Sequence, residues 1–186
     1  MQTAHELLLH EMSNMLDAER RLVAALGEQA EESSNPQVKK TLVMHQRQTA
    51  GQVRRLQQAF HSLGEEPEDS ECAGIKGLKE EHDNFRKENP SEDILDILNV
   101  AAAKKVERYE ITAYESLVQL AQEMGHKKAA QLLRQNLREE QQTLKKLVEF
   151  SKKLKPLQMG MGEVQESVQA RFTPRRKSAA TSRKAA

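Results

Sequence analysis

The sequence predicts an all-α protein, and three observations lead to this class. Ala, Leu, Glu, Lys, Gln and Arg dominate the composition, and these residues lose little side-chain freedom in a helix. Long segments with apolar residues at helical spacing lie between Pro, Gly and Ser-Asn breaks. Glycine-rich phosphate loops are missing, and one cysteine in 186 residues excludes a disulfide scaffold or a Cys-rich zinc site. A single soluble helical body is therefore expected.

The first two helices have clear start signals. Thr3 and Glu6 stand in capping-box spacing and begin a helix that is predicted over residues 4–33. Asn35-Pro36 supplies an N-cap residue and a proline at the first helical position, so a second helix is predicted over residues 36–63. Only a few residues separate the two helices.

Three further helices follow a polar break. A short one is predicted over residues 71–88, and two long ones over residues 91–124 and 127–155. Gly125 can take the left-handed conformation that closes a helix, and Pro156 stops the last one.

The connections between these helices predict the topology. Short links make the first and second long helices, and the third and fourth, antiparallel hairpins. A long crossover that carries the short helix joins the hairpins, which is typical of a ferritin-like four-helix bundle. The predicted domains are this bundle over residues 1–156, a weakly structured extension over 157–170 and a basic disordered tail over 171–186.

Polar residues interrupt the apolar stripe near the middle of every long helix. They are Glu19 on the first helix, His45, Gln48, Thr49 and Gln52 on the second, Glu107 and Glu110 on the third, and Glu140 on the fourth. Buried carboxylates cost several kcal/mol unless they are protonated, paired or bound to a metal. Glutamates with a neutral imidazole suit iron or manganese. We therefore predict a dinuclear Fe or Mn site with ligands Glu19, Glu107, Glu110 and Glu140, completed by His45 or Gln48.

A metal-free alternative explains the same residues. Charge-assisted hydrogen bonds to Arg47, Lys104 or Lys105 could replace the metal bonds. The protein would then be an interaction or structural protein whose polar layer only enforces helix register. Tyr109 and Tyr114 either orient the layer, lie near redox chemistry or pack in the core.

Several stretches carry a resemblance to a known family. They are Asp17-Ala18-Glu19-Arg20-Arg21-Leu22, His45 with Thr49, Gly51, Gln52 and Arg55-Leu56, Cys72-Ala73-Gly74-Ile75-Lys76-Gly77-Leu78, and Ala101-Ala102-Ala103-Lys104-Lys105-Val106-Glu107-Arg108-Tyr109-Glu110-Ile111 with Ala113-Tyr114. Through them the sequence resembles, over about residues 4–150, the YciE/YciF-type ferritin-like stress proteins, a bacterial family of poorly defined function.

The resemblance implies a ferritin-like bundle that forms a homodimer, has a dinuclear metal site and is expressed in stress responses beside manganese catalase-type proteins. An active site of this kind would bind or oxidise Fe²⁺ or Mn²⁺ with O₂ or peroxide, without an organic substrate. The sequence departs from the family pattern on the second helix, where relatives carry glutamates after the histidine and an acid or histidine near position 50. Arg47 and Ala50 occupy two of those expected ligand positions here.

The charge distribution adds one further hypothesis. Six of the 29 basic residues follow the last acidic residue, and they are Arg171, Arg175, Arg176, Lys177, Arg183 and Lys184. Such a tail either binds nucleic acid weakly, without sequence preference and in a salt-dependent manner, or only keeps the protein soluble. No segment has the length of apolar sequence that a membrane helix requires, and the single cysteine favours a reducing compartment, so a cytoplasmic location is predicted.

Overall fold

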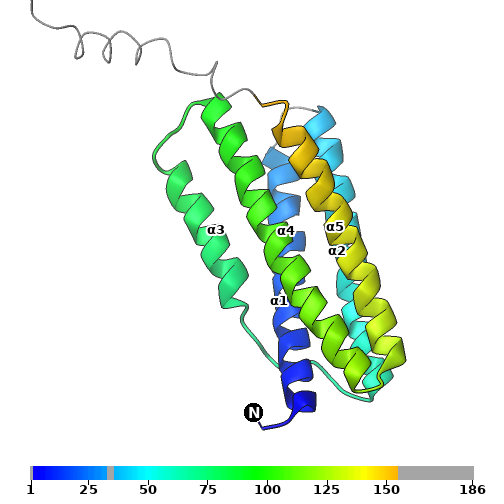
Figure 1. Cartoon of the computed structure of the whole chain (residues 1–186). Coiled ribbons are helices and arrows are strands. Elements are labelled where there is room, and N and C mark those ends of the chain that lie inside the picture. Colours follow the sequence, from blue (N-terminus) through cyan, green and yellow to red (C-terminus); the bar gives the residue numbers. More distant parts are fainter. Residues whose placement is uncertain (1, 33–35, 155–186) are drawn as a thin grey trace, which may run out of the picture.

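The computed structural model describes residues 2–32 and 36–154, and every regular element within these residues is a helix (Figure 1). Along the chain the helices are α1 (Ala4–Glu32), α2 (Pro36–Leu63), α3 (Ala73–Arg86), α4 (Glu92–Glu123) and α5 (Lys127–Ser151). The all-α prediction is confirmed. The predicted extension over residues 157–170 and the basic tail over 171–186 lie outside the described residues.

The start of α1 follows from local hydrogen bonds. The backbone N–H of Glu6 donates to Thr3 Oγ1 at 3.1 Å, and the N–H of Thr3 donates to Glu6 Oε2 at 3.1 Å. These reciprocal bonds form the expected capping box, which satisfies backbone donors that have no partner inside the helix. Gly125 has a φ of 77°, so the left-handed turn that the sequence indicated does separate α4 from α5.

Two helices are shorter than the sequence indicated. Asn89 has a φ of 51°, and this left-handed residue, of a type that tolerates the conformation, prevents α3 from continuing toward α4. At the end of α5, the N–H of Lys153 donates to the carbonyl oxygen of Phe150 at 2.9 Å. This bond tightens the last turn, and α5 therefore ends at Ser151 rather than near residue 155.

The five helices form two hairpins with a helical crossover. α1 packs along α2 and α4 along α5, and the hairpins meet through α2 against α5 and α1 against α4 (Figure 1). The crossover places α3 on the outside of the bundle, against α4 and α1. This arrangement is the ferritin-like topology that the connection lengths predicted.

The densest apolar core fills the end of the bundle where α1 begins and α2 ends. Its most deeply buried side chains are Leu8, Met12, Met15 and Leu16 of α1, Leu56 and Phe60 of α2, Tyr114 and Leu117 of α4, and Leu133 of α5. In the other half of the bundle the apolar faces of the helices are less completely buried, as at Leu22, Leu98 and Leu147. Within the described residues, no helix combines the length and the apolar character needed to cross a bilayer.

Candidate metal centre

The polar residues of the four long helices lie one helical turn beyond the dense core. Glu19 follows Leu16 on α1, Glu110 precedes Tyr114 on α4, and Glu140 lies on α5 four residues after Asn136. Residues three or four apart share one face of a helix, so the side chains that continue the apolar stripes must enter the bundle. Accordingly, Glu19, Glu107, Glu110 and Glu140 are each no more than 3% exposed.

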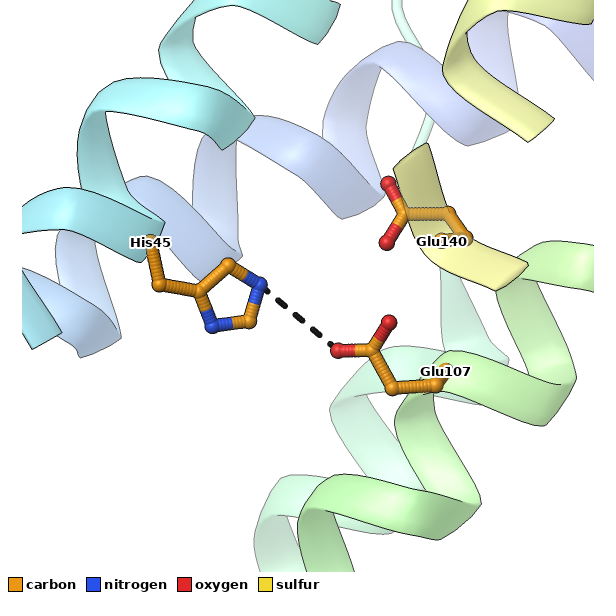
Figure 2. Close-up of side chains that lie close together, drawn as sticks. All are labelled: His45, Glu107 and Glu140. Carbon is orange, nitrogen blue, oxygen red and sulfur yellow. Dashed lines mark ion pairs between the residues drawn. The ribbon is translucent and has the colours of Figure 1, made fainter. Parts of the chain in front are cut away.

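These carboxylates form two groups that share one member. His45, Glu107 and Glu140 offer ligand atoms that all lie within 4.8 Å of one another, and so do Glu19, Glu110 and Glu140. Figure 2 shows the first group: His45 from α2 and Glu107 from α4 face each other, with Nε2 and Oε1 3.6 Å apart, and Glu140 from α5 lies beside them. A carboxylate common to two three-residue groups can serve two neighbouring metal ions at once.

Three carboxylate oxygens in this layer lack a hydrogen-bond partner within the described residues. They are Oε2 of Glu19, Oε2 of Glu107 and Oε1 of Glu110. Buried side-chain oxygens are rarely left without a partner in folded proteins, because each loses its hydration without compensation. The donor set of carboxylate oxygens and one imidazole therefore fits Fe or Mn, which accept such ligands.

Burial controls the electrostatics of the layer. It raises the pKa of Glu19 and Glu110 well above the usual value, and the charges of neighbouring carboxylates raise both further. Burial and a hydrogen bond with Glu140 raise the pKa of Glu107 to about 10, and burial raises that of Glu140 to about 7. Without a cation, several of these groups must hold a proton near neutral pH.

His45 differs from the carboxylates because it is partly accessible. Its side chain is 26% exposed, so solvent reaches the His45 end of this group, whereas Glu107 and Glu140 are each 1% exposed. Burial and the charge of Lys146 lower the pKa of His45, so the imidazole is neutral at pH 7. A neutral imidazole has the lone pair that metal binding needs.

A second set of side chains surrounds the carboxylates. The Tyr114 hydroxyl donates to Glu19 Oε1, and it accepts a hydrogen bond from Asn136 Nδ2 at 2.9 Å. Gln52 Nε2 donates to Glu140 Oε1. Arg55 donates to Asn136 Oδ1 and to Glu139 Oε2, and its charge lowers the pKa of both Glu19 and Glu140. These contacts hold two of the four carboxylates in place.

The structure brings five of the six residues expected in the site into one cluster. Gln48, the sixth, is half-buried, and its side-chain amide donates to Thr143 Oγ1 at 3.1 Å. The α2 amide bonded to a layer carboxylate is that of Gln52, which the sequence had placed in the polar turn without a role. Metal ligation by Gln48 stays a prediction.

Two of the three expected cationic partners lie away from the layer. Arg47 is exposed, and Lys105 donates to Glu81 of α3, whereas an ion pair through Lys104 stays a prediction. Arg55 is a basic residue beside the layer that the sequence analysis gave no such role. The sequence could have indicated Arg55, because it lies one turn after Gln52, close to the face of α2 that points into the bundle.

Fold and site together define a ferritin-like four-helix bundle with a buried layer of carboxylates. The chain belongs to the family described as "Domain of unknown function (DUF892)", which matches residues 3–159. It is 33% identical over 152 residues to Protein YciF of Escherichia coli K12, covering 81% of this chain and 92% of that protein. The family that the sequence motifs indicated is thus confirmed.

Solved structures agree with this assignment. The crystal structure of the E. coli stress protein YciF matches with a TM-score of 0.75 and 33% identity over 81% of this chain and 96% of that one. YcfI of Rhodopseudomonas palustris matches with a TM-score of 0.73 and 36% identity, over 78% and 93% of the two chains. A Xanthomonas campestris protein, 18% identical, shares the fold with a TM-score of 0.64 over 81% of this chain and 92% of its own.

Proposed function

We propose that the protein is a stress-associated metal protein that holds two iron or manganese ions in its buried carboxylate layer. The observation that carries this proposal is the shared position of Glu140 between two three-residue groups whose ligand atoms lie within 4.8 Å of one another. The three buried carboxylate oxygens without a partner support it, because a cation would compensate them. The description of YciF as a stress protein supports a role in a stress response.

Each ion would have its own ligands and share one. His45 and Glu107 would hold one ion, Glu19 and Glu110 the other, with Glu140 between them. Bound Fe²⁺ or Mn²⁺ with open positions accepts O₂ or peroxide, so oxidation of the metal by these oxidants is the expected activity. Tyr114 would orient Glu19, and Gln52 would orient Glu140, through the hydrogen bonds that they donate.

Metal content tests this proposal directly. The protein is purified without chelators or a His-tag, loaded anaerobically with Fe²⁺ or Mn²⁺, desalted and measured by elemental mass spectrometry. We expect about two ions per chain in the wild type, since two groups are present. Glu140→Gln removes the shared ligand and is expected to lose both ions, whereas Glu19→Gln loses mainly one. Glu115→Gln, an exposed position on α4, is the matched control and keeps both.

A wild-type protein that stays free of metal after loading would contradict the proposal. The layer would then be a set of protonated carboxylic acids joined by hydrogen bonds, and the alternative of a metal-free interaction protein would take its place. The homodimer and the cytoplasmic location stay predictions in either case.

A further inference from the structure

A thiol and a phenol are in contact beside the carboxylate layer, and the proposed metal centre does not use either. Cys72 is 0% exposed, and its Sγ lies 3.2 Å from the hydroxyl oxygen of Tyr109, where either atom can donate the hydrogen bond. The backbone N–H of Cys72 donates to Asp17 Oδ2 at 2.7 Å, and Arg21 Nε donates to the same oxygen at 2.6 Å. Side chains of α1 therefore fix the backbone position of Cys72.

The first turn of α3 has space for the phenol ring only because residue 74 is glycine. A Cβ atom at Gly74 would lie 2.5 Å from Cε2 of Tyr109 and 2.8 Å from its hydroxyl oxygen, which is closer than non-bonded atoms approach. The missing side chain lets the hydroxyl end of the ring approach the backbone of α3 closely. Asp17 on α1 thus holds the backbone of Cys72, and Gly74 on α3 leaves the space that brings the Tyr109 ring to the thiol.

Tyr109 also adjoins the proposed metal ligands. It directly precedes Glu110 on α4 and lies two residues after Glu107. Glu110 is 3% exposed and has one oxygen without a hydrogen-bond partner in the described residues. Burial and the hydrogen bond with Cys72 raise the pKa of the Tyr109 hydroxyl, and nearby acids, Glu110 among them, add to the effect. Tyr109 therefore contacts the buried thiol through its hydroxyl group and is joined through the α4 backbone to two carboxylates of the layer.

We propose that Tyr109 and Cys72 form a hydrogen-atom relay that leads an oxidising equivalent away from the carboxylate layer, with Cys72 as the terminal donor. The relay rests on the proposed function, with iron as the bound metal and hydrogen peroxide as the oxidant. In a centre in which one iron is already ferric, the remaining ferrous ion would supply one electron, the Tyr109 hydroxyl one hydrogen atom and solvent one proton, which together reduce the peroxide to two molecules of water.

The second step transfers the hydrogen atom across the 3.2 Å contact between Sγ of Cys72 and the Tyr109 oxygen. The S–H bond of Cys72 breaks, the O–H bond of Tyr109 forms again, and the unpaired electron remains on sulfur. Phenolic O–H and thiol S–H bonds have comparable strength, so this transfer is close to thermoneutral. The oxidising equivalent thereby leaves the ligands Glu107 and Glu110 and ends on a shielded side chain.

The composition makes this relay unusually simple to test. The chain has two tyrosines and no tryptophan, so any tyrosyl radical belongs to Tyr109 or Tyr114. Iron content is measured first in the wild type and in Tyr109→Phe, Cys72→Ala, Cys72→Ser and Tyr114→Phe. Each protein is loaded with Fe²⁺, partly oxidised so that one iron per centre is ferric, and given hydrogen peroxide, and samples frozen at increasing times are examined by electron paramagnetic resonance. Circular dichroism confirms that each variant is folded, and the serine variant serves if Cys72→Ala does not fold.

The relay predicts three results. The wild type shows a tyrosyl signal that decays quickly, and in Cys72→Ala or Cys72→Ser the signal lives several-fold longer because its hydrogen donor is missing. Tyr109→Phe loses this signal, whereas Tyr114→Phe, compared at equal iron content because Tyr114 contacts the ligand Glu19, retains it. After exposure to air and unfolding, alkylation with mass spectrometry finds that Cys72 has lost its free thiol in the wild type and has kept it in Tyr109→Phe.

Other outcomes overturn it. A signal that persists unchanged in Tyr109→Phe, or a lifetime that the Cys72 variants do not alter, would exclude the relay while leaving the metal centre intact. Equal loss of the Cys72 thiol in the wild type and Tyr109→Phe would mean that peroxide oxidises the thiol directly. A wild type that binds no iron would overturn the proposed function and the relay with it.

Discussion

Gly74 shows how a single residue adapts the crossover helix to the bundle. The phenol ring of Tyr109 occupies the space in which a side chain at position 74 would lie. Gly77, one turn later on the same helix, has no heavy atom within 4 Å of a Cβ built on it, and its φ is not in the left-handed region. The close approach of Tyr109 therefore accounts for glycine at position 74, whereas neither packing nor backbone conformation requires glycine at position 77.

Substitution of each glycine by alanine tests whether contact with Tyr109 restricts position 74 alone. We expect Gly74→Ala to lower the free energy of unfolding by about 1–3 kcal/mol, because the methyl group forces Tyr109 and α3 apart. Gly77→Ala is expected to raise it by up to about 1 kcal/mol, because alanine loses less backbone entropy in a helix. Urea denaturation of the two variants measures both changes. Equal effects of the two substitutions would show that Tyr109 does not rest on α3.

At the scale of the helices, one buried amide joins three of them near the carboxylate layer. Asn136 of α5 is 0% exposed and donates to the carbonyl oxygen of Gln52 on α2 at 3.3 Å and to the Tyr114 hydroxyl on α4 at 2.9 Å. It also accepts a hydrogen bond from Arg55. This junction fixes the rotation of α5 relative to α2 and α4, which in turn determines where Glu140 points.

Removing the amide tests the junction. We expect Asn136→Ala to lower the free energy of unfolding by about 2–3 kcal/mol, because it leaves a buried carbonyl and the Arg55 donor without their partner. Gln135→Ala, an exposed neighbour on the same helix, should change it by less than about 0.5 kcal/mol. Thermal and urea unfolding measure both. A cost for Asn136→Ala no larger than that of the control would show that the bonds across the three helices contribute nothing.

At the scale of the whole molecule, the carboxylate layer makes stability depend on pH. The folded state raises the pKa of Glu140 from 4.5 to about 7 and that of Glu107 to about 10. Over this range the folded, metal-free protein binds more protons than the unfolded chain, so its stability falls as pH rises. The acids whose pKa is lowered by surface pairs, such as Asp83 and Glu149, titrate below this window.

We therefore expect the metal-free protein to lose a few kcal/mol of unfolding free energy between about pH 5 and pH 8. Mn²⁺ is expected to restore stability, and more strongly at the higher pH, because only ionised carboxylates bind it. Urea denaturation with a chelator, and then with Mn²⁺, measures both effects, and Glu140→Gln should flatten part of the slope. Stability that rises with pH in the chelated protein would contradict the raised pKa values.

Local patterns in the sequence determined much of this protein. The capping box of Thr3 and Glu6, the proline at position 36 and the turn at Gly125 specify helix ends, because each depends only on neighbouring residues. The expected N-cap at Asn35 lies outside the described residues. Helical periodicity likewise placed Glu19 and Glu140 inside the bundle. The short and long connections then left the ferritin-like topology as the expected arrangement.

Only the tertiary structure decided which buried groups meet. How each helix is rotated and shifted against its neighbours decides three of these contacts. Arg55 rather than Arg47 lies beside the layer, Gln52 bonds to Glu140, and Cys72 contacts Tyr109. Packing of side chains far apart in the sequence sets that rotation. The period of a single helix shows which face is buried, and it contains no information about the residue on the facing helix that will touch it.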